Sequence, residues 1–174
     1  MITWDSSILG AKLIFNEYID VKNKRIIEFG CGTALFGISA SLNGAKSMTF
    51  TDVDSNNISG ILNENLAANS VKIQTEFLHL DWSNPDPNLL EREFDMFLAS
   101  DCTFSENLFR DFISTIKLFK EKNDQLHGYL IHECRGYEEV LISQLKKYEI
   151  DFMNIQTPVD INEDPSKFHI IFIP

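Results

Sequence analysis

Short apolar runs alternate along the chain with longer segments in which apolar residues recur every three or four positions. This rhythm predicts strands at 25–29, 47–51, 71–78, 94–98 and 128–132, with helices between them. Two last runs, 150–156 and 168–173, are joined by a polar segment without a helix, which predicts an antiparallel pair. The expected fold class is α/β: a Rossmann-like, doubly wound, mostly parallel seven-strand sheet with a C-terminal antiparallel strand pair.

The first helix is expected to begin at Asp5 or Ser6, since either side chain can cap a helix, and to end near Asn23. Its helical spacing is carried by Ile8, Ala11, Phe15 and Tyr18. The segment 81–91 contains Asn-Pro and Asp-Pro pairs and is expected to be a loop.

Length and composition favour a single domain over residues 1–174. The chain has 8 Gly and 5 Pro, too few for a flexible linker, and its 44% hydrophobic residues suffice for a core without a metal or disulfide. The three cysteines have no C-x-x-C spacing, so no disulfide framework and no metal site are expected.

The charge and the N-terminal pattern restrict partners and location. A net charge of −11 disfavours nucleic acid and favours a basic partner. No segment approaches the roughly 18 apolar residues of a membrane span, and the first residues lack a signal-peptide pattern. We therefore expect a soluble cytoplasmic protein with no membrane contact, with the nucleus as an alternative and the oligomeric state left open.

The turn after the first strand carries the clearest chemistry. Gly30 and Gly32 let the backbone turn sharply and approach a ligand, and Asp52 follows 22 residues after Gly30, at the end of the second strand. A carboxylate at that distance can accept hydrogen bonds from both hydroxyls of a ribose, which indicates a nucleoside. Two glycines can also serve a strand-to-helix turn for purely structural reasons. The presence of Asp52 favours the interpretation as a ligand-binding turn.

Other positions restrict which nucleoside compound can be the ligand. Leu35 occupies the third glycine position of G-x-G-x-x-G and a Walker lysine is missing, which disfavours NAD and ATP. Glu28 can address the amino group of an amino-acid moiety near the turn, which points to S-adenosylmethionine. Asp81 and Trp82 can contact an adenine, although a turn cap beside a core tryptophan explains them too. Asp101 either faces the methyl-transfer zone or caps a turn.

Together these residues resemble the seven-strand (class I) S-adenosylmethionine-dependent methyltransferases, and within them the protein-lysine methyltransferase branch with its D-x-x-Y-like motif. The matching segments are 4–9, 28–34, Asp52, 80–82 and 101–104. The resemblance implies cofactor contacts at Trp4, Gly30, Cys31, Gly32, Asp52, Trp82 and Ser100. It implies an acceptor site lined by Asp101 and Phe104.

Three departures from the family pattern stand out. Ala34 replaces the last glycine of E-x-G-x-G-x-G, and Phe104 replaces the tyrosine of the tetrad, removing a hydroxyl but keeping an aromatic face. The chain also begins almost at Trp4, so we expect it to use a partner or to recognise a smaller surface.

The expected function is methyl transfer from S-adenosylmethionine to lysine side chains of an intracellular protein. Asp101 would orient the amine, although its negative charge works against the deprotonation that a lysine needs. The alternatives are a methyltransferase acting on a small molecule or a nonlysine protein nitrogen, and a catalytically silent cofactor-binding module. Nucleic-acid methylation ranks last, because 4 Arg and 11 Lys form no basic cluster.

Overall fold

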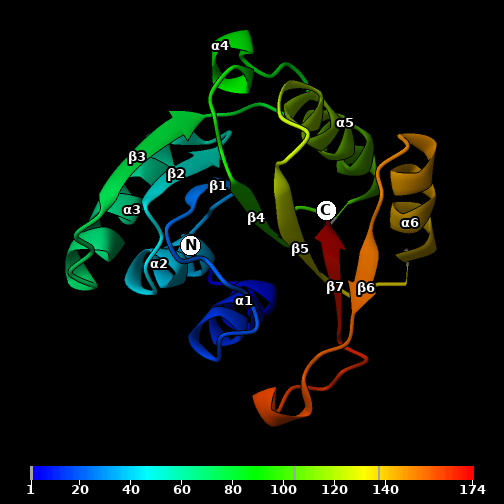
Figure 1. Cartoon of the computed structure of the whole chain (residues 1–174), viewed down its shortest axis with the longest axis horizontal. Coiled ribbons are helices and arrows are strands. Elements are labelled where there is room, and N and C mark those ends of the chain that lie inside the picture. The colour runs from blue at the N-terminus through cyan, green and yellow to red at the C-terminus, as the bar shows by residue number, and fades with distance from the viewer. Residues whose placement is uncertain (1, 104, 137) are drawn as a thin grey trace.

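The computed structural model describes residues 2–103, 105–136 and 138–174. Its strands are β1 (Arg25–Phe29), β2 (Ser47–Asp52), β3 (Gln74–His79), β4 (Met96–Ser100), β5 (His127–Glu133), β6 (Met153–Ile155) and β7 (Phe168–Ile173). They form one sheet in the order β3-β2-β1-β4-β5-β7-β6 (Figure 1). The first five strands pair in parallel, and β7 pairs antiparallel with both β5 and β6. The predicted fold class is confirmed.

Helices cover both faces of this sheet. They are α1 (Asp5–Phe15), α2 (Leu35–Leu42), α3 (Ser55–Ala68), α4 (Pro87–Leu90), α5 (Glu106–Lys122) and α6 (Glu138–Lys147), and a 3₁₀ turn (Val159–Ile161) lies between β6 and β7. Alternate strand residues face opposite layers: Ile26 packs in the cluster of α1 to α3, and Ile27 in the cluster of α5 and α6. Among the described residues, no helix is long and apolar enough to cross a membrane.

The residues whose spacing predicted α1 do not share its buried face. Ile8 and Phe15 are 37% and 56% exposed, whereas Ala11 and Leu13 are buried. The buried face is set by the neighbouring helix, because Gly10 packs so closely on Phe36 of α2 that an added Cβ would lie 2.7 Å from the ring. Helical spacing identified the helix, and the contact with α2 decided which of its two apolar stripes is buried.

Several boundaries also differ from expectation. α1 ends at Phe15 instead of near Asn23, and its N-cap residue is Trp4, without a side-chain cap. The segment expected as a loop contains α4, whose N-cap Asp86 accepts a hydrogen bond from the backbone N–H of Asn88. A side chain that caps locally is enough to start a turn of helix there.

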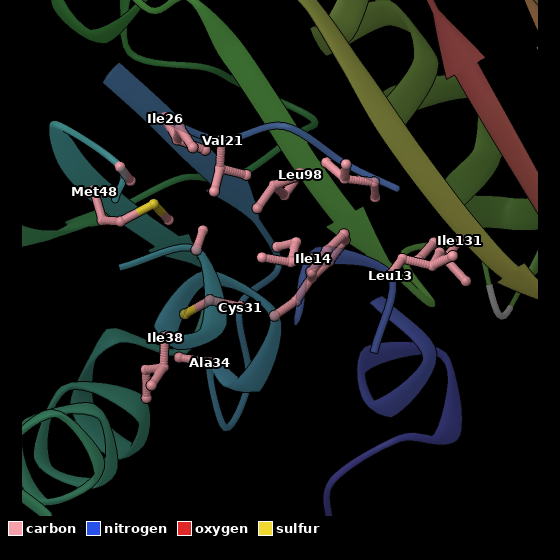
Figure 2. Close-up of a cluster of buried hydrophobic side chains, with 14 of the residues drawn as sticks. Leu13, Ile14, Val21, Ile26, Cys31, Ala34, Ile38, Met48, Leu98 and Ile131 are labelled. Atoms are coloured by element: carbon pink, nitrogen blue, oxygen red, sulfur yellow. The ribbon is translucent and has the colours of Figure 1, made fainter. Parts of the chain in front are cut away.

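The turn after β1 is anchored in the core. Figure 2 shows Cys31, Ala34 and Ile38 in the cluster between the sheet and α1 to α3, where Leu13 of α1 lies beside Ile131 of β5. Cys31 is 6% exposed and Ala34 is fully buried. The segment that carries the glycines is therefore held by packing at its C-terminal end.

Ala34 is strained in this position. It precedes α2 in the left-handed region, with φ 62° and ψ 22°. A Cβ in this region costs roughly 1–2 kcal/mol, which explains why the family pattern E-x-G-x-G-x-G has glycine at this position. Packing of the buried methyl group holds the residue in place.

A pair of glycine substitutions isolates this strain. Ala34→Gly and Ala40→Gly each remove a fully buried methyl group, but only Ala34 has a positive φ. We expect Ala34→Gly to be more stable than Ala40→Gly by about 2–3 kcal/mol in chemical denaturation, because about 1–2 kcal/mol comes from relief of strain at Ala34 and about 1 kcal/mol from the helix propensity lost at Ala40. A difference of about 1 kcal/mol or less would show that Ala34 bears no strain.

Candidate active site

A cavity of about 470 Å³ opens at the carboxyl ends of β1, β2 and β4, beside the start of α1. This edge is where ligands bind in doubly wound sheets. The predicted site residues that line it are Trp4, Gly30, Cys31, Gly32, Asp52, Asp81, Trp82, Ser100 and Asp101. Residues spread over almost a hundred positions of sequence are thus brought to one place.

The two glycines meet different demands. Both have positive φ, 60° at Gly30 and 52° at Gly32. A Cβ on Gly30 would lie 3.1 Å from the Cys102 sulfur and 3.2 Å from the Trp82 ring, while one on Gly32 would meet nothing within 4 Å. Gly30 is therefore fixed by packing as well as backbone conformation, and Gly32 leaves the backbone open toward the cavity.

Asp52 is tied to the glycine turn. Its Oδ2 accepts a hydrogen bond from the Gly32 N–H at 3.1 Å, and its Oδ1 accepts one from the Asp54 N–H at 3.3 Å. The Cys31 N–H donates to the Thr51 carbonyl at 2.9 Å, so Cys31 holds the turn against β2. These bonds place a carboxylate and the turn on the same cavity wall.

The Asp-Trp pair after β3 forms another part of the wall. The Trp82 ring packs against Phe112 of α5, and the two ring centroids lie 4.9 Å apart. The backbone carbonyl of Trp82 accepts a hydrogen bond from Thr115 Oγ1 at 3.1 Å. Asp81 Oδ1 accepts from the hydroxyl and the N–H of Ser83, at 2.7 and 2.9 Å, and these bonds lower the pKa of Asp81. Asp81 is therefore ionised at the cavity at neutral pH.

Asp101 faces a cation of the chain itself. Its two carboxylate oxygens accept hydrogen bonds from Nη1 and Nη2 of Arg135 at 2.5 and 2.7 Å, and its side chain is 2% exposed. Sequence reasoning did not single out Arg135, because nothing in its neighbourhood links it to residue 101. The other predicted acceptor-site residue, Phe104, lies outside the described residues.

The structure does not bring Glu28 to the cavity. Its side chain is 1% exposed and accepts a hydrogen bond from the Gly37 N–H in α2 at 3.1 Å. A Cβ at Gly37 would lie 2.3 Å from that oxygen. Burial, assisted by the charge of Asp52 and opposed by the Gly37 N–H, raises the pKa of Glu28 to about 8. Glu28 therefore holds the start of α2 and does not line the cavity.

Sequence reasoning missed other lining residues, among them Thr33, Val53, Leu108 and Asp111. Thr33 and Val53 are chain neighbours of the glycine turn and Asp52, so proximity in sequence could have found them. Leu108 and Asp111 lie on α5 beside its buried residues Phe109 and Phe112, where the sequence carries no chemical motif. Only the packing of α5 across the end of the sheet brings them to the cavity.

The cavity is acidic. Asp52, Asp81, Asp101 and Asp111 contribute to its wall, and the lining residues that the structure describes include no lysine or arginine. Asp101 pairs with Arg135 and Asp111 with Arg110, while Asp52 and Asp81 bond to backbone or serine groups. Such a wall favours cationic ligands.

Comparisons with known proteins agree with this fold. A family model described as lysine methyltransferase matches residues 1–154. The chain belongs to this family, which confirms the resemblance in the motifs.

Individual relatives differ in the residue that their names specify. The chain is 30% identical over 125 residues to "Histidine protein methyltransferase 1 homolog" of Dictyostelium discoideum, covering 71% of this chain and 40% of that protein. It is 24% identical to mouse "Protein N-lysine methyltransferase METTL21A", covering 97% of this chain and 70% of that protein. The chain thus spans less than half of the Dictyostelium relative.

Solved structures share the fold. Magnesium protoporphyrin IX methyltransferase of Synechocystis PCC 6803, solved with bound SAM, superposes with a TM-score of 0.65 at 12% identity, over 97% of this chain and 77% of that one.

The raised pKa of Glu28 predicts how stability varies with pH. Between about pH 4.5 and 8 the folded state keeps a proton that the unfolded state loses, so this group's contribution to stability falls as pH rises, by up to about 1.4 kcal/mol per pH unit. We expect Glu28→Gln, which stays neutral and can accept the Gly37 hydrogen bond, to remove this fall. Denaturation at pH 5 to 9 measures it. Parallel pH curves for the two proteins would contradict the prediction.

Proposed function

We propose that this chain is an S-adenosylmethionine-dependent N-methyltransferase whose cofactor binds in the cavity, and that residues 1–174 form one methyltransferase domain. The observation that carries the proposal is Asp52 beside the glycine turn at the cavity wall. The residues present fit the group, because a carboxylate, an open glycine backbone and an indole share one acidic cavity. Its volume of about 470 Å³ lies within the ~300–1,000 Å³ of small-molecule sites.

Each wall of the cavity has a separate task in this proposal. Asp52 accepts hydrogen bonds from the ribose hydroxyls, and Trp82, with Asp81 beside it, forms the adenine side. Trp4, Cys31 and Ser100 complete the wall. When bound, S-adenosylmethionine supplies a methyl group on a sulfonium, and transfer makes an N–C bond while the S–C electron pair stays on sulfur. The chain's residues chiefly align the acceptor nitrogen and exclude water.

The acceptor that we propose is a lysine side chain of an intracellular protein, lying beside Asp101 and Phe104. The family description and the N-lysine relatives support a lysine, and the acidic cavity favours a cationic approach. A histidine side chain is the second candidate, because the relative at 30% identity is named for histidine.

Loss of the Asp52 charge should weaken cofactor binding. We expect Asp52→Asn to raise the Kd for S-adenosylhomocysteine about tenfold or more in calorimetry, since hydrogen bonds to a charged group contribute ~1.5–3 kcal/mol. The matched control is Asp54→Asn, because Asp54 caps α3 without lining the cavity and asparagine caps equally well. Equal affinities for the two variants would refute the ribose contact.

Mass spectrometry decides the acceptor. The chain is incubated with cell lysate and isotope-labelled S-adenosylmethionine, with Asp52→Asn as the low-affinity control. We expect label on protein lysine side chains, reduced in the control at limiting cofactor. Label on histidine would establish the second candidate, and label confined to small molecules or nucleic acid would refute both. Cofactor binding without transfer to any component would indicate the silent binding module.

A further inference from the structure

The pair formed by Arg135 and Asp101 is built into the fold and stands outside the residues that would hold the cofactor. Asp101 directly follows β4 and has a φ of 56°, and its N–H donates to the Ile131 carbonyl of β5 at 2.9 Å. This fixes the carboxylate between the cavity and the β5–α6 connection. Arg135 approaches from that connection, and it is not among the residues that line the cavity.

Arg135 and its neighbours in the chain make further hydrogen bonds to described residues besides the fork on Asp101. Its Nη2 donates to Glu133 Oε2 at 2.6 Å. Its backbone N–H and that of Gly136 donate to Glu138 Oε1 at 2.5 and 2.9 Å. The next residue toward β5, Cys134, donates its N–H to the Lys167 carbonyl at 2.8 Å. The fork on Asp101 is therefore preorganised by the loop and is not a chance surface ion pair.

This fork changes what Asp101 can do for an amine. A lysine nitrogen attacks only as the neutral amine, and its reference pKa is about 10.4. An unpaired carboxylate close to the nitrogen would stabilise the ammonium form and oppose the reaction. With both oxygens bonded to Arg135, Asp101 contributes shape and a charge compensated by a guanidinium, which it shares with Glu133, instead of a free negative charge.

We propose that Arg135 is a positioning residue for methyl transfer, whose fork keeps Asp101 from pairing with the acceptor's ammonium so that the lysine reaches the methyl donor as the neutral amine. The proposal rests on the proposed function. In the methyl transfer the lone pair of the amine nitrogen forms the new N–C bond, and the electron pair of the broken S–C bond stays on the sulfur of S-adenosylmethionine. Water takes the proton that the amine has lost.

Other charged and titratable groups surround the pair from every side. They are Cys102 next to Asp101; His132, Glu133, Cys134 and Glu138 on the β5–α6 side; Lys167 and His169 at the start of β7; and Asp52, Asp81 and Asp111 around the cavity. Burial lowers the pKa of His132, whose Nδ1 lies 2.6 Å from Thr103 Oγ1. All of these groups remain when Arg135 alone is changed, but Glu133 loses its partner together with Asp101. The Asp101→Asn change on the Arg135→Met background therefore separates the effect of Asp101 from that of Glu133.

The first test needs no turnover. The probe is n-butylammonium, a charged mimic of a lysine side chain, titrated at pH 7.5 with S-adenosylhomocysteine present and followed by NMR. We expect Arg135→Met to bind the probe at least tenfold more tightly than wild type, and Asp101→Asn on that background to abolish the gain. The neutral probe n-butanol should show no such gain. Arg135→Gln replaces Arg135→Met if that variant folds poorly, and Arg135→Lys, which keeps the charge, should behave like wild type.

The second test is the pH profile of turnover on the lysine acceptor found by mass spectrometry. Arg135→Met should move the midpoint of kcat up by about one pH unit and lower KM, because the ammonium form is favoured. The double variant Arg135→Met/Asp101→Asn should return the midpoint to the wild-type position, which a merely structural role would not do. Arg92→Met removes a surface arginine paired with Glu76 and serves as the control for lost charge.

The two proposals fail separately. If the wild type transfers no methyl group to lysine, the proposed function is wrong, and the butylammonium titration still decides the role of Arg135. If Arg135→Met or its Gln substitute gains no affinity for the cation, or if the pH midpoint stays where the wild type has it, Arg135 does not act as proposed.

Discussion

The site depends on how the turn after β1 is tied to its surroundings. Cys31 bonds to β2 through its backbone N–H, Gly32 donates to Asp52, and Glu28 holds the first turn of α2 through Gly37. Three consecutive elements thus meet at one short segment. Because the bonds use backbone N–H groups, they fix the path of the chain as well as the side chains. Gly30, Gly32 and Ala34 adopt left-handed geometry along this path, and only Ala34 is strained by it.

Burial sorts the acidic residues at this end of the sheet into different roles. Glu28 is enclosed by the core and its pKa is raised, whereas Asp81 is stabilised as a carboxylate by Ser83. The charged side chain of Asp101 is only 2% exposed. It can be buried because Arg135 donates hydrogen bonds to both of its carboxylate oxygens. The same chemical group therefore acts as a structural bond, as a cavity wall and as half of an ion pair, depending on its partners.

The connection between β6 and β7 supports the start of the chain. Tyr18 bonds to Asp160 at 2.6 Å, Lys12 pairs with Glu163, and Lys167 pairs with Asp5 at 2.5 Å. In Figure 1 this connection extends beyond the sheet on the side of α1. Exposed pairs of this kind contribute little individually. Their effect is to join the last strands to the helix that carries Trp4 into the cavity wall.

The sequence by itself determined the alternation of strands and helices, the glycine turn, and the acids that follow the strands. These features are local: apolar period, positive φ and strand-end position can each be found within a few residues. They placed Asp52, Asp81, Trp82 and Ser100 at one edge, because the carboxyl ends of parallel strands must meet there.

Tertiary structure decided the rest. Glu28 turned inward because α2 offers its carboxyl group a buried N–H, and α1 buries Leu13 because Gly10 fits Phe36. Arg135 reached Asp101, 34 positions away, because β4 and β5 are neighbours in the sheet. Contacts of this kind depend on which surfaces pack together, and the spacing of residues along the chain does not predict them.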